Sequence, residues 1–293
     1  MTASVIGVIG GSGLYDLPGL TNAAWTRVES PWGEPSDDLL IGEIAGKKLV
    51  FLPRHGRGHR VPPSDIDYRA NIDAMKRAGV TDIVSVSAVG SYREDLAPGT
   101  FVLVDQFVDR TVRRASSFFG AGCVAHVAFG HPVSPGLMDR LEAAAQAEAI
   151  DCRRGGTYVC MEGPQFSTLA ESLWYRSAGF DVIGMTNMPE AKLAREAEIP
   201  YATVAMVTDY DCWHPDHDHV DVKSVIAVAH ANADKAKRLV ARFAADFPDA
   251  HPACPIGSDR ALDFAIMTSR DVRDPALLAK LDAVAGRVLA PRS

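Results

Sequence analysis

Short apolar runs alternate with amphipathic segments along the 293 residues of this chain, and this alternation sets the fold class. Three of the amphipathic segments each lead within a few residues into an apolar run; the pairs are 64–79 into 82–87, 168–179 into 181–185, and 189–198 into 201–207. Helices that feed directly into strands predict an α/β fold, with a mixed, twisted sheet flanked by helices. In such folds ligands bind beside the carboxyl ends of the strands, so a functional site is expected there.

Apolar runs bounded by Gly, Pro or Asp predict the strands, and longer periodic segments predict the helices. We expect strands at 4–9, 39–44, 48–52, 82–87, 101–105, 157–161, 181–185 and 201–207. We expect helices at 64–79, 137–149, 168–179, 189–198, 224–247 and 275–289. Ser64 with Asp67 and Thr168 with Glu171 have the spacing of capping boxes, and Pro189 suits a first helical position.

Composition and charge limit the ligand and the compartment. No long Ser/Gly/Pro linker or internal repeat interrupts the sequence, so we expect a single domain over residues 1–293. The net charge is −7 and Lys and Arg are scattered, which argues against nucleic acid as a partner and favours a small molecule. Five irregularly spaced cysteines form no CxxC pair, a pattern typical of reduced thiols in a cytoplasmic protein. The N-terminal apolar run is soon interrupted by glycines, so we expect neither a signal peptide nor a membrane span.

Two carboxylates, Asp209 and Asp211, directly follow the apolar run 201–207. In an extended chain, side chains two residues apart point to the same face, so we expect this pair to share a site. Because two carboxylates on one face repel each other, the pKa of one of them should be raised toward the protonated form. A protonated Asp can donate to a ring nitrogen while its other oxygen accepts from an amine. That pattern matches the edge of adenine that carries N7 and the 6-amino group.

Four segments that follow predicted strands offer groups for binding an anion. The glycine-rich turn at 10–13 exposes backbone N–H groups and carries the hydroxyl of Ser12, although it matches neither the dinucleotide fingerprint nor the Walker pattern. An ordinary tight turn is the alternative. Arg54 and His55 follow the run 48–52, and arginine suits tetrahedral oxyanions; the alternative is a solvated basic loop.

Two hydroxyls stand at the other strand ends. Ser87 ends the run 82–87, and Thr186 comes just before a predicted helix. Both hydroxyls can donate to an anion. Taken singly, each side chain is equally consistent with an ordinary cap or turn residue.

The stretch 214–219, His-Pro-Asp-His-Asp-His, has the composition of a metal site. Zinc sites usually draw their ligands from separate elements, whereas this stretch is one loop that contains proline. We therefore expect a solvated loop or a gate over the ligand rather than a metal centre.

In combination these segments resemble the methylthioadenosine phosphorylase branch of the trimeric purine nucleoside phosphorylase family. The resemblance extends from about residue 5 to about 240. It rests on the motifs Gly-Gly-Ser-Gly-Leu (10–14), Arg-His-Gly (54–56), Asn-Ile-Asp-Ala-Met-Lys (71–76), Asp-Gln-Phe-Val-Asp-Arg-Thr (105–111), Glu-Gly-Pro-Gln-Phe-Ser (162–167), Gly-Met-Thr-Asn-Met-Pro-Glu-Ala (184–191) and Thr-Asp-Tyr-Asp-Cys-Trp (208–213). It implies a phosphorylase/hydrolase-like fold and reversible phosphorolysis of 5′-methylthioadenosine to adenine and 5-methylthioribose 1-phosphate.

The resemblance also assigns roles to individual residues. It implies a phosphate site made of Ser12, Arg54, His55, Ser87, Ala88 and Thr186. It implies that the base and ribose are bound by Phe166, Met185, Asp209, Tyr210 and Asp211, with Asp209 and Asp211 catalytic. Ser12 and Ser87 replace the Thr of eukaryotic members and keep the hydroxyl.

The family resemblance also implies which residues surround the 5′-substituent of the substrate and how many chains associate. Specificity is expected from Ser167, Val222, His59 and His126, together with the nearby Val220 and Val225; His126 would reach into a neighbouring subunit's site. A homotrimer and a cytoplasmic enzyme of purine and methionine salvage are implied. No metal or other cofactor is implied, and inorganic phosphate is a co-substrate. A helix at about 275–289 is expected to close over the substrate pocket.

Two alternatives remain open from the sequence. One is phosphorolysis of methylthioinosine or of other purine nucleosides such as adenosine and inosine, against which Asp209 argues. The other is a non-catalytic purine-binding protein, since folds of this type are reused. Pure binding would not need Arg54 and His55 in a separate anion site.

Asp209→Asn should shift preference from adenine nucleosides toward inosine-type nucleosides. Relatives specific for 6-oxopurines carry Asn at this position, because the oxygen at position 6 needs a donor opposite it. Release of adenine from methylthioadenosine and of hypoxanthine from inosine would be compared for the two proteins. Full retention of adenine release without any gain of hypoxanthine release would show that this role of Asp209 is wrong.

Overall fold

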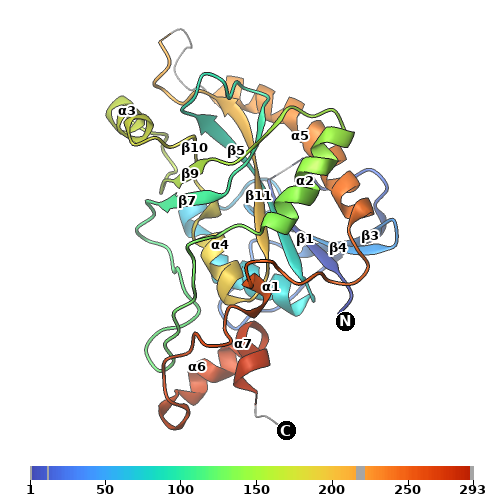
Figure 1. The fold of residues 1–293 in the computed structure, drawn as a ribbon, viewed down its shortest axis with the longest axis vertical. Coiled ribbons are helices and arrows are strands. Elements are labelled where there is room, and N and C mark those ends of the chain that lie inside the picture. The colour runs from blue at the N-terminus through green and yellow to red at the C-terminus, as the bar shows by residue number, and fades with distance from the viewer. Residues whose placement is uncertain (1, 12, 216–221, 291–293) are drawn as a thin grey trace.

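The computed structural model describes residues 2–11, 13–215 and 222–290, with the side chains of residues 222–225 excepted. It contains an 11-stranded sheet (Figure 1). The strands are β1 Val5–Gly10, β2 Thr21–Thr26, β3 Leu39–Ile44, β4 Lys47–Pro53, β5 Asp82–Ser91, β6 Phe101–Leu103, β7 Gln106–Asp109, β8 Cys152–Arg154, β9 Thr157–Cys160, β10 Val182–Gly184 and β11 Tyr201–Asp209. The helices are α1 Tyr68–Arg77, α2 Pro135–Ala147, α3 Leu169–Ser177, α4 Asn187–Glu196, α5 Val222–Asp246, α6 Pro275–Lys280 and α7 Asp282–Leu289, and short 3₁₀ turns lie at Pro63–Asp65, Ser258–Arg260 and Arg270–Val272.

The sheet is mixed, as the sequence predicted. Its main path runs β2-β3-β4-β1-β5-β10-β9-β7, and β11 pairs with β5 and β6. The central strands β1, β4, β5 and β11 are parallel neighbours, whereas β10 runs antiparallel to β5. The parallel strands are buried along nearly their whole length, which is why their sequences are continuous apolar runs.

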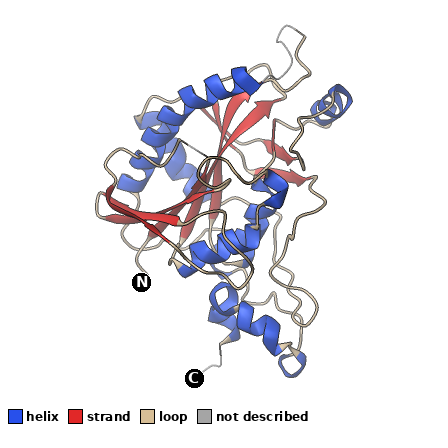
Figure 2. Ribbon diagram, turned by 180° about the vertical axis from the view of Figure 1, so that it is seen from behind, coloured by secondary structure: helices blue, strands red, loops and turns tan. Residues whose placement is uncertain are grey.

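Helices cover both faces of this sheet (Figure 2). One core cluster joins α1, α4 and α7 to the sheet, and a second joins α2 and α5 to the opposite face. The packing of two helical layers on one sheet confirms the predicted α/β class. None of the helices in the described part of the chain is both long and apolar enough to span a bilayer.

Local chemistry explains where the elements differ from the sequence-based prediction. The first long helix begins at Tyr68 rather than Ser64, because the side chain of Asp67 caps it by accepting from the N–H of Ala70. The predicted capping box of Thr168 and Glu171 is confirmed. Strands β2, β7 and β8 were missed: β2 is exposed at every position, so it lacks the apolar alternation of a buried strand, and β8 has only three residues.

The predicted helix at 275–289 is two helices, α6 and α7, which meet at the buried Leu281. Charged pairs anchor α7: Arg77 of α1 binds Asp282, and Arg287 binds the buried Glu198 at 2.6 Å. Helix α7 therefore packs against α1, and α6 packs against α7, at the lower end of the view in Figure 1. The expected closure over the pocket is not found within the chain, because no residue of 275–289 lines its cavity.

Candidate active site

The carboxyl ends of β1, β4, β5 and β11 open into one cavity of about 840 Å³, and residues of α5 also line it. Most of the predicted site residues line this cavity: Arg54, His55, His59, Ser87, Ala88, Phe166, Met185, Thr186, Asp209 and Asp211. Ser12 and Val220 lie outside the described residues, as do the side chains of Val222 and Val225. Segments as far apart in sequence as Gly11 and Ala233 thus meet at one edge of the sheet, as the strand ends predicted.

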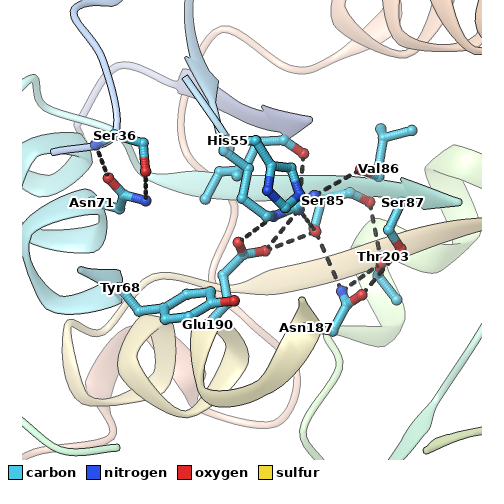
Figure 3. A network of polar contacts seen from close by, with 12 residues as sticks. Ser36, His55, Tyr68, Asn71, Ser85, Val86, Ser87, Asn187, Glu190 and Thr203 are labelled. Carbon is cyan, nitrogen blue, oxygen red and sulfur yellow. Dashed lines mark hydrogen bonds and ion pairs between the residues drawn. The ribbon is translucent and has the colours of Figure 1, made fainter. Parts of the chain in front are cut away.

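We call the part of the cavity that is lined by Arg54, His55, Ser87 and Thr186 its anion-binding end. Within it, Arg54 is 1% exposed. Its Nε and Nη2 donate to the carboxylate of Glu190 at 2.8 and 3.1 Å, which can be followed around Glu190 in Figure 3. Its Nη1 donates to the carbonyl oxygen of Val86 at 3.1 Å, which leaves one N–H of that nitrogen for a ligand. The alternative of a solvated basic loop is therefore wrong for Arg54. It describes Arg57, which is exposed and pairs with Asp37 at 2.6 Å.

His55 is buried beside Arg54. Its Nδ1 lies 2.9 Å from the carbonyl oxygen of Val61, so Nδ1 carries the proton and donates. Its ring stacks on that of His59, with centroids 4.2 Å apart. Burial, followed by the charge of Arg54, lowers the pKa of His55 to about 4. The ring is consequently neutral near pH 7, and Nε2 is an acceptor.

Two hydroxyls complete the described part of the anion-binding end. Thr186 precedes α4 but makes no side-chain capping bond to it, so the ordinary cap that the sequence left open does not apply. The hydroxyl of Ser87 donates to Asn187 Oδ1 at 3.1 Å. Ala88, next to it, contributes only a small exposed side chain at the cavity wall.

Asp209 and Asp211 both line the other end of the cavity, but not by the extended geometry that the sequence suggested. β11 ends at Asp209, and Asp211 has a left-handed backbone with φ of 52°. The N–H of Asp211 donates to Asp209 Oδ1 at 2.8 Å, and Thr208 Oγ1 donates to Asp209 Oδ2 at 2.7 Å. A tight turn closed by the first carboxylate thus brings the second one into the same site.

Burial raises the pKa of both carboxyl groups. For Asp209 the charge of Asp211 also raises the pKa, but it is the smallest of the causes. Desolvation rather than the predicted repulsion therefore favours the protonated form. The hydroxyl of Tyr92 donates to Asp211 Oδ2 at 3.0 Å, which stabilises the charge on Asp211. Tyr92 was missed by the sequence analysis, because it follows a different strand, β5.

Three predicted residues do not line the cavity. Tyr210 is turned away, since its hydroxyl donates to the carbonyl oxygen of Glu94 at 3.1 Å and its ring packs against Trp213. Ser167 lies behind the wall, with its hydroxyl directed at Met161 Sδ. His126 is exposed on a segment joined to Ala265 by a backbone hydrogen bond. Tyr210, predicted to bind substrate, and Ser167, predicted to set specificity, are therefore absent from the cavity lining, and their roles stay predictions.

Arg114 links the two walls of the cavity and was also missed. Its Nη1 donates to the carbonyl oxygens of Met185 and Met188 at 2.6 and 2.7 Å. Its Nη2 donates to the carbonyl oxygen of Glu162 at 2.7 Å, and its Nε pairs with the Glu162 carboxylate. The two motifs at 162–167 and 184–191 are therefore joined by one buried guanidinium. No group of His, Cys, Asp or Glu in the described ranges has the arrangement of a metal site. Residues 216–219 of the histidine-rich stretch lie outside those ranges.

One cavity of this α/β fold holds both an anion-binding end and a pair of buried carboxyl groups. This combination indicates a protein of the phosphorylase class. The sequence profile of the phosphorylase superfamily matches residues 5–245, and the chain belongs to this family.

Its relatives carry a more specific name. The S-methyl-5′-thioadenosine phosphorylase of Bradyrhizobium diazoefficiens is 69% identical over 289 residues, which cover 99% of both chains. The enzyme of that name from Cereibacter sphaeroides is 62% identical and covers 98% of this chain and 99% of the relative.

Solved structures agree with the sequences. A methylthioadenosine phosphorylase from an antarctic soil metagenomic library superposes with a TM-score of 0.91 at 47% identity, covering 97% of this chain and 99% of that one. The methylthioadenosine phosphorylase of Schistosoma mansoni, in complex with adenine, superposes with a TM-score of 0.78 at 36% identity, covering 82% and 90%.

The buried, neutral His55 should make the protein less stable below pH 6.5. The unfolded chain takes up this proton near pH 6.5, whereas the folded protein resists it down to about pH 4, so stability falls as the pH falls through this window. The loss attributable to His55 between pH 7 and pH 5 should be roughly 2 kcal/mol.

Urea unfolding at both pH values and fixed protein concentration would measure it. The loss of unfolding free energy between pH 7 and pH 5 should be smaller in His55→Gln than in the wild type. The control variant His131→Gln, which changes an exposed histidine, should lose as much as the wild type. Equal losses in the wild type and His55→Gln would contradict the assignment of a neutral, buried imidazole.

Proposed function

We propose that this chain catalyses the reversible phosphorolysis of 5′-methylthioadenosine to adenine and 5-methylthioribose 1-phosphate. The observation that carries the proposal is that one cavity holds both Arg54, with a free N–H, and the aspartate pair Asp209 and Asp211. A relative whose sequence is 69% identical to this chain is named for this activity. The reaction makes the protein a pentosyltransferase of purine and methionine salvage.

Phosphate attacks C1′ of the ribose as the glycosidic bond breaks. The anion-binding end orients the phosphate, and such alignment can lower a barrier by roughly 7–11 kcal/mol. The phosphate anion, held between Arg54 and Thr186, lies beside the sugar and stabilises the positive charge that develops on the ribose. Met185, adjacent to Thr186 on the same wall, and Phe166 are the contacts for ribose and base.

The departing adenine gains negative charge and needs a proton at N7. Asp209 supplies it, because its raised pKa keeps a proton on the carboxyl group near neutral pH more readily than in water. General acid catalysis of this kind is typically worth about 10² to 10⁴ in rate. Asp211, held by Tyr92, accepts from the 6-amino group. The proton belongs to the coupled pair rather than to one residue.

The wall formed by α5 is apolar apart from His230, and its apolar part suits a methylthio group better than a hydroxyl. Ile226, Ala229 and Ala233 line the cavity there. Asp209 disfavours inosine and methylthioinosine, which present an acceptor at position 6. A non-catalytic purine binder would not need the buried Arg54 at a second, anionic subsite.

Inorganic phosphate is the co-substrate, and the chemistry requires neither a metal nor another cofactor. The whole chain, 1–293, acts as a single nucleoside phosphorylase domain built on the one sheet. The five free cysteines agree with a cytoplasmic enzyme.

Release of adenine from methylthioadenosine, measured with and without phosphate, tests this function. The expected result is release that depends on phosphate and yields a sugar phosphate. Release without phosphate would indicate a hydrolase. Turnover of oxopurine nucleosides alone would mean that the aspartate pair does not recognise adenine.

The enzyme acts as a homotrimer in this proposal. Large apolar side chains are exposed on two surfaces of the single chain; they are Phe166, Leu169, Leu173 and Trp174 around α3, and Phe264, Met267 and Val272 in the C-terminal third. Phe264 is 97% exposed, which is costly for an isolated chain and favours burial against another copy. His126 is joined to the second surface, near Ala265, and is thereby available to a neighbouring cavity.

Sedimentation equilibrium should give three times the chain mass of 31.4 kDa. Phe264→Asp should shift the protein toward smaller species, because a charge would then replace an apolar contact. A single-chain mass for the wild type at micromolar concentration would refute the trimer.

A further inference from the structure

A chain of hydrogen bonds behind the anion-binding end begins at the carboxylate of Glu190 (Figure 3). Glu190 is 1% exposed and can only accept. The hydroxyl of Ser85 donates to its Oε1 at 2.8 Å, and the hydroxyl of Tyr201 donates to the same oxygen at 2.9 Å. The hydroxyl of Thr203 gives its proton elsewhere, to the carbonyl oxygen of Ser85 at 3.2 Å. Each of these hydroxyls has one proton, and each proton is used.

The directions of these hydrogen bonds determine the orientation of the Asn187 amide. Asn187 is fully buried, and one end of its amide faces Tyr201, Thr203 and Ser85 at 2.6, 2.8 and 3.3 Å. These three oxygens have no proton left to give, so the end that faces them must be the donating Nδ2. Oδ1 therefore faces the opposite way, toward Ser87.

The direction of the last hydrogen bond is fixed in turn. Asn187 Oδ1 is an acceptor, so the hydroxyl of Ser87 donates to it at 3.1 Å. Turning that proton into the cavity would leave Oδ1 buried without its donor, which is unfavourable. Ser87 thus presents lone pairs rather than a proton to the ligand. This direction differs from the sequence-based expectation that Ser87 donates to an anion.

A second acceptor stands at the same end of the cavity. His55 donates through Nδ1 to Val61, and its ring is neutral because burial lowers its pKa to about 4, so Nε2 offers a lone pair. The positive charge of Arg54 is opposed by Glu190. An anion without a proton would place its lone pairs against the acceptors of both Ser87 and His55, which is unfavourable. An anion with an O–H group can instead donate a hydrogen bond to one of these acceptors.

We infer that Asn187, anchored through this chain to Glu190, positions Ser87 as a hydrogen-bond acceptor, so that the site selects tetrahedral oxyanions that carry a proton. Hydrogenphosphate and hydrogenarsenate have such a proton near neutral pH, and sulfate has none. The inference rests on the proposed phosphorolysis, and it specifies which form of the co-substrate the site binds. Asn187 is a positioning residue, because it acts on the ligand only through Ser87.

Competition between sulfate and phosphate tests the inference. The quantity to measure is the ratio of the inhibition constant of sulfate to the KM of phosphate, during methylthioadenosine cleavage at pH 7.5 and constant ionic strength. Ser87→Ala should lower this ratio by roughly tenfold, because phosphate loses its acceptor while sulfate loses an unfavourable contact. Ser87→Thr, which keeps the hydroxyl, should retain the wild-type ratio.

Thr186→Val is the matched control, since Thr186 also lines the cavity and its hydroxyl makes no capping bond to α4. It should weaken phosphate and sulfate alike and leave the ratio unchanged. If Ser87→Ala also weakens both anions by the same factor, Ser87 is a donor and the inference is overturned.

The failure of the proposed function would look different, because no phosphate-dependent adenine release would occur in the wild type. The binding of inorganic phosphate and sulfate, measured by calorimetry on the same variants, would then test the anion selectivity independently. A wild-type protein that binds sulfate as tightly as phosphate would overturn it.

Discussion

The buried ion pair between Arg54 and Glu190 is the interaction on which the site depends. Both side chains are about 2% exposed, and Nε of Arg54 lies 2.8 Å from Glu190 Oε2. A single buried charge would be strongly unfavourable, so each residue requires the other. Arg54 follows β4 and Glu190 belongs to α4, so the pair also fixes α4 against the central strands. The turn that carries Arg54 is therefore tied to α4 by a buried ion pair.

The two ends of the cavity achieve their chemistry by similar means. At each end a group that could carry a charge is buried, and burial shifts its pKa toward the neutral form. His55 is neutral because burial, followed by the charge of Arg54, lowers its pKa, whereas the hydrogen bond from Nδ1 to Val61 fixes which ring nitrogen carries the proton. Asp209 has a raised pKa because it is buried at the end of β11. A site that receives a proton with phosphate and gives one to adenine thus needs no metal to do so in the proposed mechanism.

The walls between the two ends are joined from behind the ligand. Arg114 crosses between the segments that carry Glu162 and Met185. With its side chain only 1% exposed, it holds backbone carbonyl oxygens that would otherwise be buried without donors. Arg114 does not line the cavity itself, yet it joins the two segments that contribute Met161 and Met185 to the lining.

The sequence by itself determined the α/β class and the buried central strands, because continuous apolar runs and helical periodicity are local properties. It also indicated that Arg54, Thr186 and the aspartates stand at or just after strand ends, whereas Ser87 lies within β5, which continues to Ser91. It missed the exposed β2, whose residues follow no apolar pattern, and it did not show that the hydroxyl of Tyr210 donates to the carbonyl oxygen of Glu94, outside the cavity lining. Only the tertiary structure decided that Glu190 neutralises Arg54 and that Asn187 fixes the proton of Ser87. Hydrogen-bond direction depends on which buried groups meet in space, and those partners lie as much as 136 residues apart in the chain.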